Sequence, residues 1–314
     1  MVLGRAVLFL IWALVPALAT ATGSKLDELS RHRWIHGADD CASDRNPPIE
    51  VFEYDAYTYV LRQNKCVHFE APFMYLLLGK HTALLIDTGA TAEAVRFPLR
   101  ETVDKIMVGR FGHATVPLLV AHSHGHRDHK AADEQFHGLD RVRVIAPEAR
   151  GVTGFLAELA DERGALELGE RTITVFAVPG HHAQSLAFYD SQTRWLITGD
   201  TIYPGVISIM DWEAYQASVS RMLEFSRSHP ISALLGAHIE MSSTAGRAYR
   251  RGTIYQPDEA SLVLPVDVLE ELNAALLQTR GRRDTLVMSH LIIDPVSWPM
   301  RVLTGVLKRL QNDQ

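Results

Sequence analysis

The chain has 314 residues, of which 47% are hydrophobic and 22% are charged, proportions typical of a soluble globular protein. Its formal net charge of -6 argues against sequence-independent nucleic-acid binding, which needs clustered lysine and arginine. The 15 histidines are an unusually high number and point toward metal chemistry.

The first residues have the pattern of a secretory signal peptide, predicted over residues 1–21. Arg5 supplies a positive charge, and an apolar run over residues 6–19 is followed by small residues suited to cleavage. The alternative is an uncleaved anchor, but this run is shorter than the roughly 20 residues that span a bilayer. We expect an exported protein, periplasmic or secreted, without stable membrane insertion after cleavage.

Residues 22–48 are polar and are predicted to form an irregular N-terminal leader. The chain contains only two cysteines, Cys41 and Cys66. Two interpretations remain open, namely a disulfide bond or two free buried thiols. Export to an oxidising compartment favours the disulfide.

Residues 49–245 are predicted to form one domain. Strands are expected at residues 49–54, 58–62, 71–78, 81–86, 116–121, 142–146, 171–178, 185–189, 195–197 and 233–235. Helices are expected at residues 92–108, 130–136, 152–162 and 212–227. This alternation predicts an α/β fold in which helices form layers over sheets.

Residues 246–314 are predicted to form a C-terminal extension packed on that domain. Helices are expected at residues 266–277 and 297–310. A strand expected at residues 285–293 either extends a sheet or forms part of a lid.

The densest group of metal-ligand residue types follows the apolar strand that ends at Ala121. The run has the pattern H-x-H-x-D-H and contains His124, His126, Asp128 and His129. Imidazole and carboxylate groups are common zinc ligands. So many ligands in six positions cannot all face one ion. We therefore predict two ions, the first bound by the two leading histidines and the second by Asp128 and His129.

Three later strands also end in ligand residue types. His181 follows a Pro-Gly turn and suits the first ion, whereas His238 suits the second. Asp200 ends a strand between them and is suited to bridge both ions. Each signal alone is weak, but together they complete two ligand sets.

With these motifs the chain resembles the metallo-β-lactamase superfamily over roughly residues 50–245. The resemblance implies a four-layer αββα sandwich with a C-terminal helical extension and two zinc ions, although iron or manganese could replace zinc. It also implies that Asp87, in the sequence Ile86-Asp87-Thr88-Gly89, orients the metal ligands without binding metal. The bridging aspartate is more similar to the glyoxalase II and lactonase branch than to true β-lactamases.

This resemblance implies a zinc-dependent hydrolase that attacks its substrate with a metal-bound hydroxide. Asp128 is expected to accept the proton of the attacking water. Tyr203 is a candidate donor to the substrate carbonyl, because its spacing from Asp200 is similar to that in lactonases of the superfamily. The alternative for Tyr203 is a packed side chain near a turn.

Four further side chains have more ordinary interpretations. We expect His122 to be structural and Glu240 to hold a loop. His182 is a candidate for the mouth of the pocket. Trp212 is expected to pack in the core from its helix.

The expected substrate is a small molecule with an ester, lactone or thioester bond. Alternatives are a phosphodiesterase, a β-lactamase, an iron-dependent sulfur dioxygenase on the same fold, or a non-catalytic metal-binding protein. No pattern in the sequence predicts the oligomeric state.

Overall fold

We describe the fold from a computed structural model, which covers residues 24–112, 116–161 and 165–296. The predicted signal peptide and the helix predicted at residues 297–310 lie outside these ranges. Within them, no helix has the length and apolar character needed to cross a membrane.

The first sheet contains six strands in the order in which they occur in the chain. They are β1 (Ile49–Asp55), β2 (Thr58–Gln63), β3 (Phe73–Leu78), β4 (Ala83–Ile86), β5 (Leu118–Ala121) and β6 (Val142–Val144). The pairs β4–β5 and β5–β6 are parallel, and the other pairs are antiparallel. The carboxyl ends of β4 and β5 therefore lie at the same edge of this sheet.

The second sheet also contains six strands, in the order β13-β12-β10-β9-β8-β7. They are β7 (Ala165–Glu167), β8 (Thr172–Ala177), β9 (Leu186–Asp190), β10 (Trp195–Gly199), β12 (Ala233–Gly236) and β13 (Val263–Leu264). Strands β10 and β12 are parallel, and β8 runs in the same direction because it is antiparallel to β9. These three strands therefore also end at a common edge.

A small third sheet joins the middle of the chain to its C-terminal part. Strand β11 (Val206–Ile209) pairs in parallel with β15 (Ile292–Pro295), which pairs with β14 (Leu286–Val287). The strand predicted at residues 285–293 is thus a short hairpin. The C-terminal part contributes strands as well as a helix.

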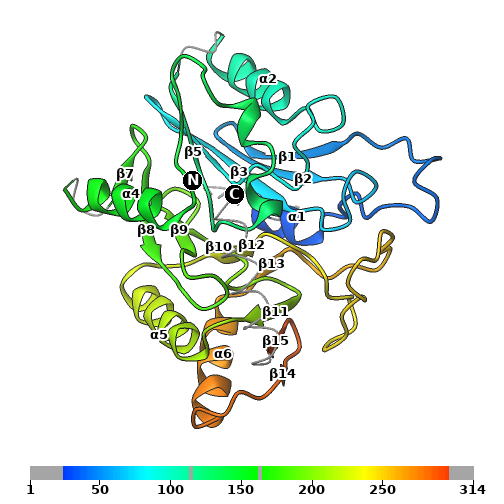
Figure 1. Ribbon diagram of the computed structural model, residues 1–314, viewed down its shortest axis with the longest axis vertical. Helices are drawn as coiled ribbons and strands as arrows, with labels where there is room; N and C mark the ends of the chain where they lie inside the picture. Colours follow the sequence, from blue (N-terminus) through cyan, green and yellow to red (C-terminus); the bar gives the residue numbers. More distant parts are fainter. Residues whose placement is uncertain (1–23, 113–115, 162–164, 297–314) are drawn as a thin grey trace, which may run out of the picture.

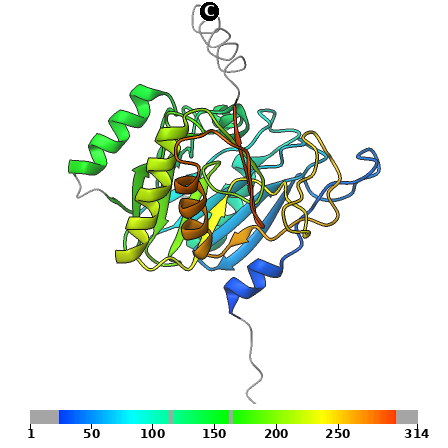
Figure 2. The same ribbon diagram turned by 90° about the horizontal axis from the view of Figure 1, so that it is seen from below.

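The helices are α1 (Lys25–Arg31), α2 (Leu99–Phe111), α3 (Arg127–Lys130), α4 (Ala149–Asp161), α5 (Trp212–Ser228) and α6 (Asp267–Gln278), with a short 3-10 turn at Asp133–Gln135. Helix α2 lies on one side of the molecule and α5 and α6 on the other (Figure 1). Helices α5 and α6 lie side by side over the second sheet (Figure 2).

The core shows why these elements form layers. Along β3, Tyr75 and Leu77 pack between the two sheets, whereas Met74 and Leu76 pack outward with α2. This alternation follows from the two-residue period of a strand. The outer face of the second sheet packs with buried residues of α5 and α6, including Trp212. The four-layer αββα sandwich is confirmed, and Trp212 is a core residue.

The observed helices differ from the expected ones in their boundaries, and local sequence explains two of these differences. The helix predicted at residues 92–108 begins only at Leu99, after Pro98, and continues to Phe111. Residues 130–136 do not form one helix; α3 ends at Lys130, and a separate 3-10 turn follows at Asp133–Gln135. The leader is not wholly irregular, since Ser24 and Asp27 form a reciprocal capping box that begins α1.

A buried ion pair links the two large sheets. Arg171 contacts both carboxylate oxygens of Asp190, at the end of β9, and both side chains are fully buried. The same guanidinium donates to the carbonyl of Tyr57, in the turn between β1 and β2, and to the hydroxyl of Thr58 in β2 of the first sheet. Because β9 is antiparallel to β10, this link lies at the opposite edge of the second sheet from Asp200.

Candidate metal centre

The predicted ligands come together where strands of both large sheets end. Two groups of four side chains form, and in each group the ligand atoms lie within 4.8 Å of one another. We call His124, His126, His181 and Asp200 the first metal position. We call Asp128, His129, Asp200 and His238 the second metal position. These two groups contain the same residues as the two ligand sets predicted from the sequence.

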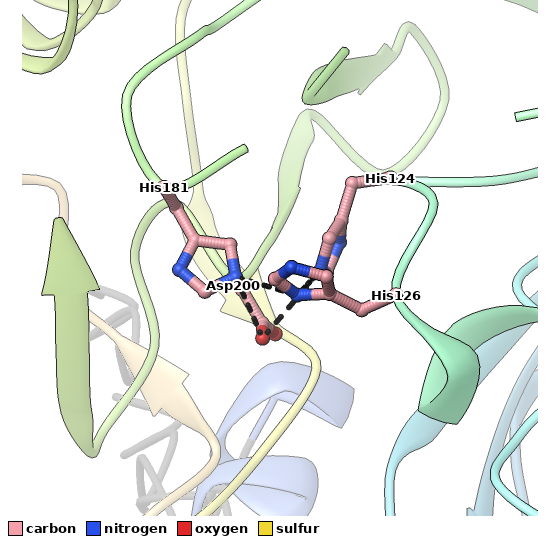
Figure 3. Close-up of side chains that lie close together, drawn as sticks. All are labelled: His124, His126, His181 and Asp200. Carbon is pink, nitrogen blue, oxygen red and sulfur yellow. Dashed lines mark hydrogen bonds and ion pairs between the residues drawn. The ribbon is translucent and has the colours of Figure 1, made fainter. Parts of the chain in front are cut away.

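The first metal position is formed mainly by histidines whose rings converge (Figure 3). The Nδ1 atom of His126 lies 2.8 Å from Nε2 of His124 and 3.1 Å from Nε2 of His181. Asp200 Oδ2 lies 3.8 Å from His124 Nε2 and 3.5 Å from His181 Nε2. Ligands that each lie about 2.1 Å from a tetrahedral zinc ion lie roughly 3.4 Å apart. The spacing fits such an ion.

The second metal position contains two carboxylates and two imidazoles. Asp128 Oδ2 lies 3.3 Å from Nε2 of both His129 and His238. The other oxygen of Asp200, Oδ1, lies 3.5 Å and 3.4 Å from the same two nitrogens. Asp200 thus presents one oxygen to each position, as expected of a bridging ligand.

Two buried atoms support a cation at the second metal position. Nε2 of His129 and Oδ1 of Asp200 make no hydrogen bond with any residue that the structure describes. Leaving such buried polar atoms unpaired is costly. A cation bound there would pair both atoms, so the residues present fit a metal ion.

The protonation preferences of the two positions differ. Burial, and then the neighbouring His181, lowers the pKa of His126 to about 3. Burial also lowers the pKa of His124 well below its ordinary value and lowers that of His181. These imidazoles are therefore neutral at pH 7, the form that binds metal.

At the second metal position the carboxylates reverse this effect. Burial alone would lower the pKa of His238, but Asp200 and Asp128 raise it to about 9. Burial also opposes protonation of His129, yet the carboxylates of Asp128, Asp200 and Asp87 raise its pKa well above the ordinary value. The same pairing holds the pKa of Asp128 below its ordinary value despite burial. This position attracts positive charge.

Asp87 orients the ligands, as predicted. It is buried at the end of β4, where its Oδ2 accepts from Nδ1 of His129 at 2.8 Å. Its Oδ1 accepts from the backbone N–H of Ser123 at 2.7 Å, and the Ser123 hydroxyl donates to Oδ2. Asp87 thus holds both the start of the ligand loop and the ring of His129.

The hydroxyl of Tyr203 donates to the carbonyl of Val206 at 2.9 Å and lies 3.2 Å from Glu240. Its ring lies 5.5 Å from the ring of His238, on the side of the second metal position. To donate to a substrate, the hydroxyl must exchange its bond to Val206, so its catalytic role stays a prediction. Glu240 also accepts from the backbone N–H of Val206 at 2.8 Å and holds that loop, as expected.

The two other histidines singled out from the sequence, His122 and His182, differ in their surroundings. His122 is buried between the carbonyl of Ile145 and the carboxylate of Asp133, at 3.0 and 2.8 Å, which confirms a structural role. The His182 ring lies 4.9 Å from the His126 ring, next to the first metal position.

Both positions open into a cavity of about 690 Å³. Beside the ligands it is lined by residues that the sequence did not single out, including Phe69, Glu70, Arg127, Val206, Ser208, Tyr249, Arg251 and Asp294. Arg127 had a signal that could have been used, because it stands between two ligands in the H-x-H-x-D-H run. The others come from loops and from β11 and β15, with no motif to reveal them.

Comparison with known proteins identifies the family. Residues 69–290 match the sequence profile of the metallo-beta-lactamase superfamily. The chain belongs to this superfamily. The resemblance seen in the motifs is thereby confirmed, and the protein is a metallo-beta-lactamase-superfamily hydrolase.

Several relatives have names that describe an activity. The acyl-coenzyme A thioesterase MBLAC2 of Gallus gallus is 26% identical in an alignment of 221 residues, and the match covers 58% of this chain and 77% of the relative. A hydroxyacylglutathione hydrolase of Mesorhizobium japonicum is 28% identical over 88 residues, 28% of this chain and 34% of that protein. The chain thus spans about one third of the latter's length.

Among solved structures, the metallo-beta-lactamase from Pontibacter korlensis is similar with a TM-score of 0.48 and 15% sequence identity. That match covers 73% of this chain and 99% of the other.

Proposed function

We propose that this superfamily hydrolase uses two zinc ions to cleave an ester, lactone or thioester bond. The observation that carries the proposal is the shared carboxylate of Asp200, which faces two complete ligand sets at the base of one cavity. When bound, the ions would polarise a substrate carbonyl and lower the pKa of water.

The chain's own residues supply the proton transfer. Asp128 lines the cavity, and His129 and His238 keep its pKa low enough for it to stay ionised. An ionised carboxylate at this place can accept the proton of the attacking water and later pass it to the leaving group. Tyr203 would then donate to the substrate carbonyl.

A thioester is the first choice within this substrate class. Its support is the names of two relatives, an acyl-coenzyme A thioesterase and a hydroxyacylglutathione hydrolase. The cavity is lined by the aromatic side chains of Phe69 and Tyr249, which an acyl chain could contact, and by the exposed cationic side chains of Arg127 and Arg251.

The test is a panel assay of the zinc-loaded mature protein against thioesters, lactones, phosphodiesters and cephalosporins. We expect hydrolysis of a thioester or lactone, and we expect Asp128→Ala to lower kcat on it by about 10²–10⁴-fold. Asp294→Ala is the matched control, because Asp294 lines the same cavity without belonging to either ligand set.

Preferential cleavage of phosphodiesters or cephalosporins would replace the proposed substrate class. Metal analysis together with oxygen uptake on persulfides tests the sulfur dioxygenase alternative. Unchanged turnover in Asp128→Ala would contradict the assigned proton transfer.

We also propose that the protein is exported. The signal-peptide pattern of residues 1–21 supports this. So does the disulfide between Cys41 and Cys66, since such bonds persist mainly in oxidising compartments. Detection of a processed N-terminus outside the cytoplasm would test export.

A further inference from the structure

One histidine in each metal position is oriented by a backbone carbonyl, which belongs to a strand in the first position and to a loop in the second. Nδ1 of His181 donates to the carbonyl of Ser208 at 2.8 Å, and Ser208 lies in β11, paired with β15. Nδ1 of His238 donates to the carbonyl of Glu70 at 3.0 Å. Glu70 lies in no strand but in the loop of residues 64–71, between β2 and β3. We call this segment the Glu70 loop.

The hydrogen bond to Glu70 matters because it decides which ring nitrogen carries the proton. A proton on Nδ1 leaves the lone pair of Nε2 directed at Asp128 and Asp200, where a metal would bind. Groups that orient a metal-binding imidazole typically affect metal affinity by about 10–100-fold. The Glu70 carbonyl therefore helps to set the geometry of the second metal position.

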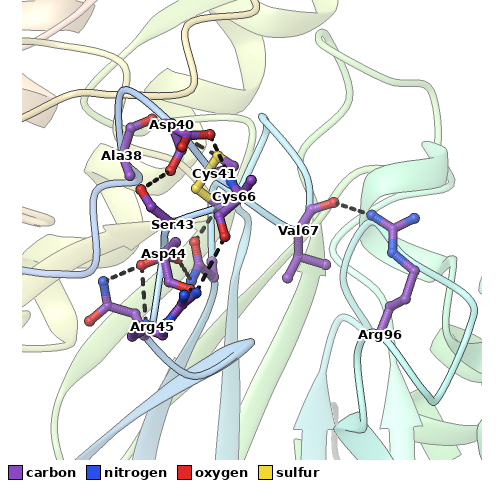
Figure 4. Close-up of a disulfide and its surroundings, with 12 residues drawn as sticks. Ala38, Asp40, Cys41, Ser43, Asp44, Arg45, Cys66, Val67 and Arg96 are labelled. Carbon is purple, nitrogen blue, oxygen red and sulfur yellow. Dashed lines mark hydrogen bonds between the residues drawn. A yellow bond between two sulfur atoms is a disulfide. The ribbon is translucent and has the colours of Figure 1, made fainter.

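The Glu70 loop is held by a few internal bonds. The buried side chain of Lys65 donates to the carbonyl of Phe69 at 2.9 Å, and the backbone of Val67 donates to Asn64. From outside the loop, Arg96 donates to the carbonyl of Val67 at 3.1 Å (Figure 4).

The strongest attachment of the loop is to the leader. Cys66 forms a disulfide with Cys41, which confirms the bond favoured from the sequence (Figure 4). Beside it, the Asn64 amide donates to the Asp44 carboxylate at 2.7 Å. One covalent bond thus fixes the loop four residues before Glu70.

We propose that the Cys41–Cys66 disulfide is a positioning crosslink for the second metal position, acting through the Glu70 carbonyl on His238. This inference rests on the proposed pair of metal sites. Reduction by a dithiol breaks the S–S bond, gives two cysteine thiols and oxidises the dithiol to its own disulfide. The loop then loses its covalent tie, and the second position binds its ion more weakly.

The experiment titrates the metal-free protein with cobalt(II), follows visible absorption, and measures both affinities by competition with a chelator. Asp128→Ala identifies the binding phase that belongs to the second position. In the double variant Cys41→Ser/Cys66→Ser, we expect the affinity of that phase to fall by about tenfold or more. Cobalt absorption of that phase should also change, while the first phase stays the same. Wild-type protein treated with a dithiol should behave like the variant.

Met107→Ala is the control for general loss of stability, because Met107 is buried in α2 and outside the Glu70 loop. Urea unfolding shows whether the variants are destabilised to a similar extent. Both phases should be unchanged in this control.

Equal weakening of both phases, an unchanged second phase, or binding of fewer than two ions by wild-type protein would overturn the inference. The proposed function fails separately, if the protein binds two ions but hydrolyses nothing.

Discussion

The two metal positions take ligands from the same six-residue run but are supported by different parts of the fold. At the first position, His181 is oriented by a carbonyl of a paired strand, β11. At the second position, His129 is oriented by the side chain of Asp87 and His238 by a carbonyl of the Glu70 loop, which belongs to no strand. We infer that the second position is the more easily disturbed.

The positions also differ in charge. The first combines three imidazoles with one oxygen of Asp200, and these imidazoles have lowered pKa values. The second adds a whole carboxylate, Asp128, and its imidazoles have raised pKa values. A cation meets unprotonated imidazoles at the first position but must displace protons from the imidazoles at the second.

The largest effect is expected from a substitution that removes Asp200, the side chain that both metal positions share. Asp200→Ala should reduce the bound metal from the proposed two zinc ions to fewer than one and lower kcat/KM by roughly 10³-fold or more, because both ligand sets lose an oxygen. Metal analysis after dialysis measures the first quantity. If Asp200→Ala retains two tightly bound ions, the bridging role is wrong.

A smaller effect is expected from Asp87→Ala, which should weaken metal binding at the second position more than at the first. His129 loses the carboxylate that orients its ring, so affinity at the second position should fall by about 10–100-fold. The first position loses no ligand and should change less. Chelator competition measures both, and equal loss at both would show that Asp87 acts on the whole ligand loop through Ser123.

The convergence of the candidate ligands could be predicted from sequence because each follows an apolar strand. His124, Asp200 and His238 come soon after strands β5, β10 and β12. Strands β10 and β12 are parallel neighbours in the second sheet, so Asp200 and His238 end at a common edge. Strand β5 belongs to the first sheet, and the packing of the two sheets brings His124 to the same place. The four layers followed from the superfamily resemblance.

The supports of the ligands could not be predicted in this way. The Glu70 loop has no motif, and its carbonyl reaches His238 across 168 positions of the sequence. The pairing of β11 with β15 likewise joins distant segments, and neither strand stands out locally. Such contacts depend on packing of the whole chain. The late start of α2 is different, because Pro98 was visible in the sequence and marks the boundary.

The pH dependence of metal affinity should also differ between the two positions. Below pH 9 a metal must displace the proton of His238, whose pKa is raised to about 9. Affinity at the second position should therefore fall as the pH falls, by about tenfold per pH unit for each proton displaced. At the first position His126 has a pKa of about 3 and holds no proton to displace between pH 5 and 9. Metal titrations at several pH values test this, and parallel slopes would contradict it.

The smallest expected effect concerns Tyr203, which lies on the side of the second position. Removing a donor to a developing oxyanion typically lowers kcat by about 10²–10³-fold. Here the hydroxyl already donates to Val206 at 2.9 Å, so each donation to substrate costs that bond and the net gain is smaller. We therefore expect Tyr203→Phe to lower kcat by about tenfold, with two ions still bound. An unchanged kcat together with lower stability in urea would assign the hydroxyl to holding the loop instead.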